Sequence, residues 1–233
     1  MKVVGVFVLA CGLSVAAGLA QTVNVNFFTS GGPKPEQLMN GTAYVEGAAP
    51  FSYSGTTWTD SKQRIEKELP DASGVKTQIG FKVDLKINRP IFYSSGVATN
   101  QLVSNYLATQ KPGDSPPPTT AEVQINGLEP ARAYDIALIS QGDKGDQGGE
   151  FIINGMSKTS AGSSPEGPLQ QGISYVVFSK VAASNAGTIN IIWKSRALTQ
   201  GHFAVLNGFQ IVPSDANSLP APEATSYASV LFP

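Results

Sequence analysis

The chain has 233 residues, among them 24 glycines and 16 prolines, and carries 17 acidic against 16 basic residues. A weakly acidic chain without basic clusters lacks the charge pattern that nucleic-acid binding needs, so we expect no nucleic acid among its partners. The many glycines and prolines, with little helix-like periodicity, are typical of a protein built from short strands and turns.

Residues 1–20 have the form of a secretory signal peptide. Lys2 precedes an apolar run that ends in small residues, which predicts cleavage before Gln21 and a secreted, extracellular or cell-surface protein with no transmembrane segment in its mature form. One alternative is an uncleaved anchor, which glycines within the run disfavour. The other is lipidation of Cys11, which the apolar residues beyond it disfavour. Cys11 is the only cysteine, so the mature chain would have no disulfide or thiolate site.

The first half of the chain predicts two strands and one or two short surface helices. Alternation of apolar and polar residues predicts a strand over 23–27, with the apolar residues inward. Residues 60–69 are highly charged and open with a capping-box pattern, which predicts a short surface helix. Residues 81–87 form the clearest strand, with apolar residues on one face and charges on the other. Apolar residues within 102–107 fit one face of a second short helix.

The second half predicts one strand after another, separated by turn signals such as Asn126-Gly127 and the hairpin signal Asn154-Gly155. Many short strands without a β-α-β rhythm predict an all-β fold, an antiparallel jelly-roll β-sandwich. We expect this sandwich to span residues 21–213. A tail rich in proline, alanine and serine would follow over 214–233.

Several segments, in chain order, resemble a known family. They are Asn100-Gln101-Leu102, Ile125-Asn126-Gly127-Leu128-Glu129-Pro130, Gly149-Glu150-Phe151-Ile152-Ile153-Asn154-Gly155, Tyr175-Val176-Val177-Phe178 and Ala204-Val205-Leu206-Asn207-Gly208-Phe209-Gln210-Ile211-Val212. The succession resembles the galactose-binding-like β-sandwich domains, close to the malectin-like type, of secreted proteins from planctomycete- and verrucomicrobia-like bacteria. The resemblance implies a sandwich fold over residues 22–213. It also implies that sugars are candidate ligands and that a structural calcium ion is a candidate cofactor.

The chain lacks the residue combinations of a hydrolase. His202 is the only histidine, and the sequence contains no Gly-x-Ser-x-Gly elbow and no zinc-type histidine spacing. No predicted strand carries acids at alternate positions, and Glu66 and Glu68 would point apart on the predicted helix. We therefore expect the protein not to be an enzyme.

The glycine-rich segment over residues 142–150 is the most unusual in the chain. Asp143, Asp146 and Glu150 would supply the oxygen ligands that Ca²⁺ prefers, which makes calcium the one cofactor that the residues suggest. The simpler interpretation is a solvated connection whose glycines adopt positive φ, because the spacing matches no established calcium loop.

Aromatic residues bear on sugar binding, because sugar rings stack on exposed aromatic rings while nearby polar groups bind hydroxyls. Trp193 shares a face with Ile189 and Ile191 and is expected in the core. Trp58 lies among threonines in a predicted loop and is the better platform. The ligand-binding candidates are Trp58, Tyr53, Tyr93, Gln147 and His202.

Two functional classes remain open. The first is a non-catalytic, lectin-like module that binds an extracellular glycan or cell-surface polysaccharide. The alternative is a structural surface or matrix protein with no small-molecule site. They differ in whether the candidate aromatic and polar side chains converge on one concavity or scatter over the molecule.

Overall fold

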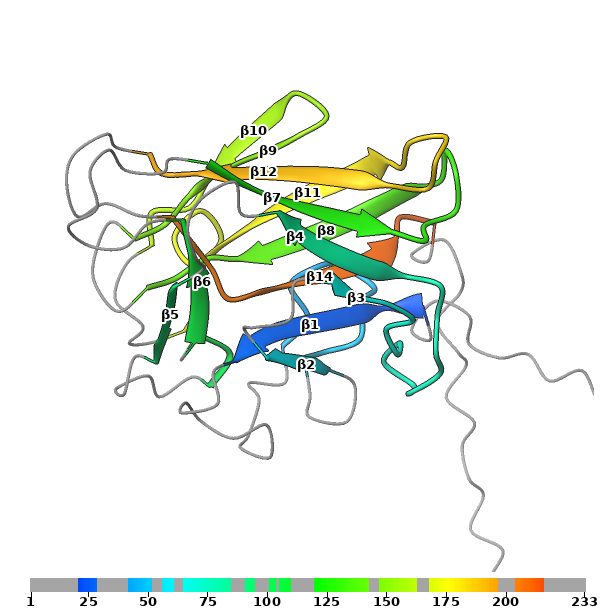
Figure 1. Cartoon of the computed structure of the whole chain (residues 1–233), viewed down its shortest axis with the longest axis horizontal. Helices are drawn as coiled ribbons and strands as arrows, with labels where there is room; N and C mark the ends of the chain where they lie inside the picture. Colours follow the sequence, from blue (N-terminus) through cyan, green and yellow to red (C-terminus); the bar gives the residue numbers. More distant parts are fainter. Residues whose placement is uncertain are drawn as a thin grey trace, which may run out of the picture.

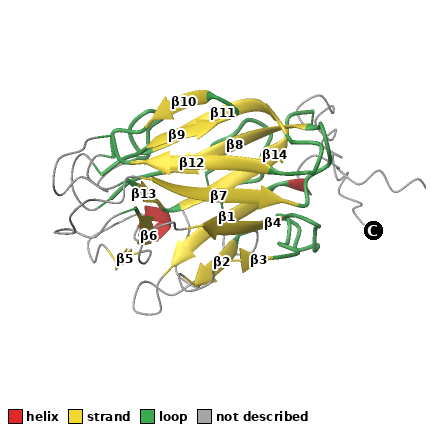
Figure 2. Cartoon of the chain, turned by 45° about the horizontal axis from the view of Figure 1, so that its top comes forward, coloured by secondary structure: helices red, strands yellow, loops and turns green. Residues whose placement is uncertain are grey.

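The computed structural model describes residues 21–28, 42–51, 56–60, 65–84, 91–94, 101–103, 105–109, 120–142, 147–162, 168–196 and 204–215. In this part of the chain the fold is an all-β sandwich, as the sequence predicted (Figures 1 and 2). None of the helical residues in these ranges belongs to a segment that is long and apolar enough to cross a membrane.

The first main sheet has five strands in the order β11-β8-β14-β1-β2. All neighbours are antiparallel except β1 and β2, which run parallel. The strands are β1 (Val23–Phe28), β2 (Thr57–Asp60), β8 (Ala133–Ile139), β11 (Tyr175–Ala182) and β14 (Gly208–Pro213).

The second main sheet has six strands in the order β10-β9-β12-β7-β4-β3, and a small third sheet has the order β13-β6-β5. The second sheet contains β3 (Ile65–Glu66), β4 (Gly80–Asp84), β7 (Thr120–Asn126), β9 (Glu150–Ile153), β10 (Met156–Thr159) and β12 (Ile189–Lys194). The third contains β5 (Ile91–Ser94), β6 (Asn105–Ala108) and β13 (Val205–Leu206). From β7 to β12 the chain passes back and forth between the two main sheets, with the hairpin of β9 and β10 staying in the second, which is the winding of a jelly roll.

The two main sheets enclose the principal hydrophobic core. Phe81 of β4 contacts Phe27 of β1 and Phe209 of β14 edge to face, with ring centroids 5.7 and 5.8 Å apart. Trp193 is fully buried in the same core, which confirms its sequence prediction. Burial of each such ring stabilises the fold by roughly 1.5–3 kcal/mol, so these contacts hold the sheets together.

The first sheet is also covered on its outer face. Residues 44–51, a 3₁₀ turn at Gln101–Val103 and the outward residues of β8 and β14 form a second hydrophobic cluster there. Asn24, Asn26 and Gln210 are consequently fully buried. Alternation correctly placed Val23, Val25 and Phe27 in the main core, but the polar residues between them do not face solvent.

The helix predicted over residues 60–69 does not form in the described residues. Asp60 ends β2, residues 65–66 form β3 and pair with β4, and Leu69 is buried. A short isolated helix has little stability of its own, so cross-strand pairing decides the structure here. Residues 61–64 lie outside the described part.

The second predicted helix is also replaced largely by a strand. Only Gln101–Val103 is helical, and β6 begins at Asn105 and pairs with β5. The hairpin prediction at Asn154-Gly155 is confirmed, since both residues have positive φ and join β9 to β10.

Candidate functional site

The two ends of the sandwich are built differently. At one end, which we call the turn end, short connections cover residues 127–132, 154–155 and 183–188, together with one longer connection over residues 67–79. At the opposite end, which we call the loop end, successive strands are separated by longer stretches of sequence, residues 109–119, 140–149, 160–174 and 195–204, of which the structure describes the parts next to the strands. Loops carried on a rigid scaffold are the usual place for binding residues, so the loop end is the candidate functional site.

Strand register brings these long connections together. Lys194, the last residue of β12, pairs with Thr120 of β7 and Glu150 of β9. On the first sheet, Ile139 at the end of β8 pairs with Tyr175 and Gly208. The described residues that flank the long connections therefore lie at one end of the molecule.

The fully buried side chain of Asn207 ties this end together. Its amide nitrogen donates to the carbonyl oxygens of Asn105 at 2.9 Å, Gln141 at 3.1 Å and Val103 at 3.3 Å. Its amide oxygen accepts the backbone N–H of Gln141 at 2.8 Å. From its position just before β14, this side chain thus links the 3₁₀ turn, β6 and the start of the connection over 140–149.

Glycines allow two of the long connections to touch. A Cβ atom on Gly148 would overlap the carbonyl oxygen of Ser160, and one on Gly162 would overlap the backbone nitrogen of Gly148. Gly142, Gly148 and Gly149 do not have positive φ, in contrast to the sequence interpretation, whereas Gly162 has a φ of 67°. Close approach of other atoms, rather than turn geometry, explains the glycines at 142 and 148: the Gln147 side chain lies against Gly142, and the backbone of Ser160 and Gly162 lies against Gly148.

Gln147 supports this contact from inside. Its side chain occupies the space beside Gly142, its backbone N–H donates to the carbonyl of Gly162 at 3.3 Å, and only 5 % of the residue is exposed. Because the residue is buried, its side chain fits a role in packing the loop end rather than in direct contact with a ligand at the surface.

The metal candidates are only partly described. Glu150 is held by two neighbours, since Oε1 accepts the Ser157 hydroxyl at 2.9 Å and Oε2 lies 3.3 Å from Lys194 Nζ. A cation would have to compete with the lysine ammonium for this carboxylate. Asp143 and Asp146 lie outside the described residues, and within the described ranges no three His, Cys, Asp or Glu residues are grouped to hold a metal.

For the remaining ligand candidates the structure describes either the backbone position alone or nothing. Trp58 lies in β2, paired in register with Asn26, so the prediction that it lies in a loop is wrong. Tyr93 lies in β5, paired with Tyr106. The side chains of Trp58 and Tyr93 are not described, and Tyr53 and His202 lie outside the described residues.

The pair of strands β1 and β2 carries an unusual group of buried oxygens. Asn26 Oδ1 and the hydroxyls of Thr56, Thr57 and Thr59 are buried, and within the described structure none of these atoms has a hydrogen-bond partner. Buried polar atoms are normally paired, so these four oxygens are exceptions. Thr57 and Thr59 are in register with Val25 and Phe27 and therefore face the main core, on the opposite side of β2 from Trp58. Sequence inspection missed this group because it depends on what covers the strands.

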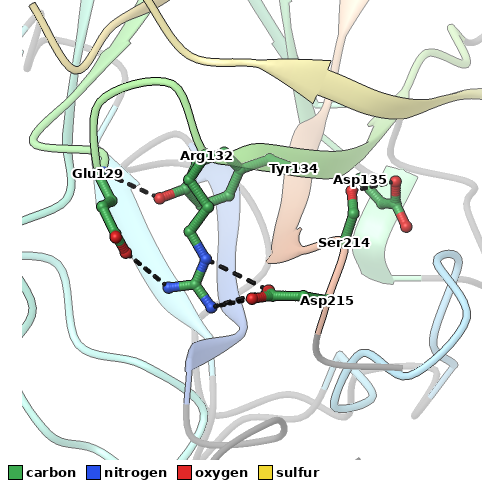
Figure 3. Close-up of polar contacts among 6 residues, drawn as sticks. All are labelled: Glu129, Arg132, Tyr134, Asp135, Ser214 and Asp215. Carbon is green, nitrogen blue, oxygen red and sulfur yellow. Dashed lines mark hydrogen bonds and ion pairs between the residues drawn. The ribbon is translucent and has the colours of Figure 1, made fainter. Parts of the chain in front are cut away.

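The most extensive ion pairing described lies at the turn end and is structural (Figure 3). Arg132 Nη2 binds both carboxylate oxygens of Asp215 at 2.8 and 3.0 Å, and Nη1 binds Glu129 at 3.0 Å. The hydrogen bond from Arg132 lowers the pKa of Asp215 below its ordinary value. Beside it, the Ser214 hydroxyl donates to Asp135 at 2.7 Å. These contacts, which we call the C-terminal clasp, hold the first two residues of the predicted tail.

No protein-family model matches the chain, and no curated protein matches it in sequence. Similar solved structures include the ANXUR2 extracellular domain from Arabidopsis thaliana, with 11 % identity, a TM-score of 0.41 and coverage of 83 % of this chain and 41 % of that one. A chain from the complex of the plant peptide RALF23 with FER and LLG2 has 8 % identity, a TM-score of 0.38 and coverage of 84 % and 40 %. The chain thus spans less than half of either plant chain.

A family 35 carbohydrate binding module from Clostridium thermocellum is also similar, with 13 % identity and a TM-score of 0.30 over 53 % of this chain and 98 % of the module. These superpositions are loose and the identities low. The fold therefore rests on the strand pairing described above, and the bacterial origin implied by the sequence resemblance is not tested by them.

Proposed function

We propose that the chain is an extracellular, non-catalytic module that binds a carbohydrate at its loop end. The observation that carries this proposal is the convergence, at one end of a well-packed sandwich, of the described residues that flank four of the long connections. The flanks of the segments that contain Asp143, Asp146 and His202 meet there, namely Gly142, Gln147, Arg196 and Ala204. Asn207 and the glycine contacts give these connections a fixed base.

The position of β2 favours a ligand with sugar rings and hydroxyl groups. Phe28 and Asp60, the paired ends of β1 and β2, lie at the loop end because Asn26 pairs with Gly208. Sugar hydroxyls both donate and accept hydrogen bonds, and Trp58 in β2 offers a ring on which a sugar can stack.

The proposal that the module is non-catalytic rests on the sequence. The chain has one histidine, and after loss of residues 1–20 it would have no cysteine, so nucleophile–base pairs and histidine metal sites have few residues from which to form. Turnover of a polysaccharide that is abolished by a single Asp or Glu substitution would contradict this proposal.

A glycan array followed by calorimetric titration tests the binding function. We expect the chain to bind at least one glycan, and Trp58→Ala, Tyr93→Ala and His202→Ala to weaken that binding. Loss of a central aromatic contact typically costs about 1–3 kcal/mol, or roughly one to two decades in Kd. Lys76→Ala is the control, because Lys76 is exposed at the turn end. Absence of binding to every glycan would favour the structural surface protein instead.

A further inference from the structure

One side of the sandwich contains an edge of each main sheet. β10 is the edge strand of the second sheet and β11 is the edge strand of the first. Lys158 of β10 reaches across between them, since Nζ donates to the carbonyl oxygen of Val177 in β11 at 2.5 Å. The same ammonium lies 5.5 Å from the centroid of the Phe178 ring. Lys158 therefore points inward from an edge strand toward the opposite sheet.

The outward carbonyl oxygens of β11 are occupied along its first half. The carbonyl of Ser174 accepts the N–H of Ser140, next to β8, so the carbonyls of Tyr175 and Val177 point to the free edge. The Tyr175 carbonyl accepts the N–H of Gly172 at 2.8 Å. The Val177 carbonyl is the one that Lys158 takes.

The second half of β11 is irregular. Its register with β8 shifts between Phe178 and Val181, and Lys180 within this bulge has a φ of 55°. The Lys180 N–H donates to Asp135 Oδ1 at 2.6 Å. A bulge twists an edge strand away from straight pairing, so a second strand could pair with β11 only along Tyr175–Val177.

We propose that Lys158 closes this remaining stretch of the β11 edge to a second copy of the chain and thereby keeps the protein monomeric. A strand added beside β11 would displace the ammonium from the Val177 carbonyl and cover it next to the Phe178 ring. Covering an unpaired charge is costly, so the lysine opposes edge-to-edge pairing. β10 has only four residues, all of them exposed, so it offers little apolar surface whose burial could offset the cost of covering this charge. This proposal is independent of carbohydrate binding.

Replacement of Lys158 tests the proposal. Lys158→Met keeps an aliphatic side chain over Phe178 without the ammonium, and Lys158→Thr is too short to reach Val177. We expect both variants to associate with rising concentration, with light scattering after size exclusion giving a mass of two chains or more. Wild type and Lys158→Arg should keep the mass of one chain. Lys82→Met is the matched control, because Lys82 is an exposed residue of β4, away from this edge.

Hydrogen exchange locates the new contact. In the associated variants the Val177 amide should exchange more slowly than in wild type, because its N–H points to the same free edge as its carbonyl. A folded Lys158→Met or Lys158→Thr variant that stays monomeric at high concentration overturns the proposal. Unfolding of both variants also overturns it, since Lys158 would then hold the fold rather than guard its edge.

Discussion

At the scale of single residues, buried amides connect segments that are far apart in the sequence. Gln210 accepts the backbone N–H groups of Tyr44 and Val45 at 2.9 and 3.0 Å and donates to Asn24 at 2.8 Å. At the loop end, Asn207 likewise accepts a backbone N–H, that of Gln141, and donates to the carbonyl of Asn105. A buried amide with all its partners holds a segment in one position, and its loss leaves several backbone groups unpaired.

Asn207→Ala should therefore be strongly destabilising. It removes the partner of three carbonyls and one N–H, and each unsatisfied buried group costs about 1–3 kcal/mol, so we expect a loss of roughly 3 kcal/mol or more in the free energy of unfolding. Urea denaturation measures this loss. Asn190→Ala is the control, because Asn190 is exposed and bonds only to Gln124 among its described contacts, and it should cost about 0.5 kcal/mol or less. Equal effects of the two variants would contradict this role of Asn207.

Gly162→Ala tests the close contact at the loop end. Gly155→Ala is a matched control, since both glycines have positive φ but a Cβ atom on Gly155 meets nothing. In the control, the free energy of unfolding should fall only by the cost of the left-handed backbone conformation, about 1–2 kcal/mol. In Gly162→Ala it should fall clearly more, because the added Cβ overlaps the backbone at Gly148. Thermal unfolding compares them, and similar melting temperatures for the two variants would show that the contact is readily relieved.

At the scale of elements, local patterns predicted the turns and inward strand faces correctly but failed for the two helices, where long-range strand pairing decides the structure. The Asn154-Gly155 hairpin and the inward face of β12 with Trp193 follow from a few neighbouring residues. The parallel pairing of β2 with β1 joins segments about thirty residues apart, which no local pattern encodes. The same holds for the ion pair between Glu150 and Lys194, which requires the register of β9 and β12.

The candidate site was predicted less well than the core. Gln147 was expected to bind ligand, yet the reason for its burial is the space left by Gly142, which no pattern around residue 147 reveals. Trp58 was assigned to a loop because threonines surround it, but threonine is also a good strand former. Core residues follow from periodicity, whereas site residues depend on contacts between distant connections.

The C-terminal clasp gives a prediction for pH. Because Arg132 lowers the pKa of Asp215 in the folded state, the clasp contributes stability above the unfolded carboxyl pKa of about 3.9. That contribution is lost as the pH falls through the lower folded value. The pair is largely exposed, so Asp215→Asn should cost about 1 kcal/mol or less at pH 7. Denaturation of both proteins at pH 7 and near pH 2 measures it, and a difference that does not shrink in acid would contradict the role of this carboxylate.

At the scale of the whole molecule, the strand ends at the loop end flank four of the long connections, whereas the turn end has three short connections and the longer one over residues 67–79. Calcium is the cofactor that the connection over 142–150 suggested, but Glu150 is engaged by Lys194 and Ser157. We therefore expect the melting temperature to be the same in millimolar Ca²⁺ and in chelator. A higher melting temperature in Ca²⁺ would indicate that the folded state binds the ion and would support the calcium site that the sequence suggested.

The central claim is that this end of the sandwich binds carbohydrate. The most direct measurement is titration of the best glycan from an array against wild type, His202→Ala and Lys76→Ala, with unfolding of each protein measured in parallel. We predict that His202→Ala weakens binding by about tenfold, or about 1.4 kcal/mol, without loss of stability, and that Lys76→Ala binds like wild type. Binding that is lost in Lys76→Ala but kept in His202→Ala would place the site at the turn end and contradict the claim.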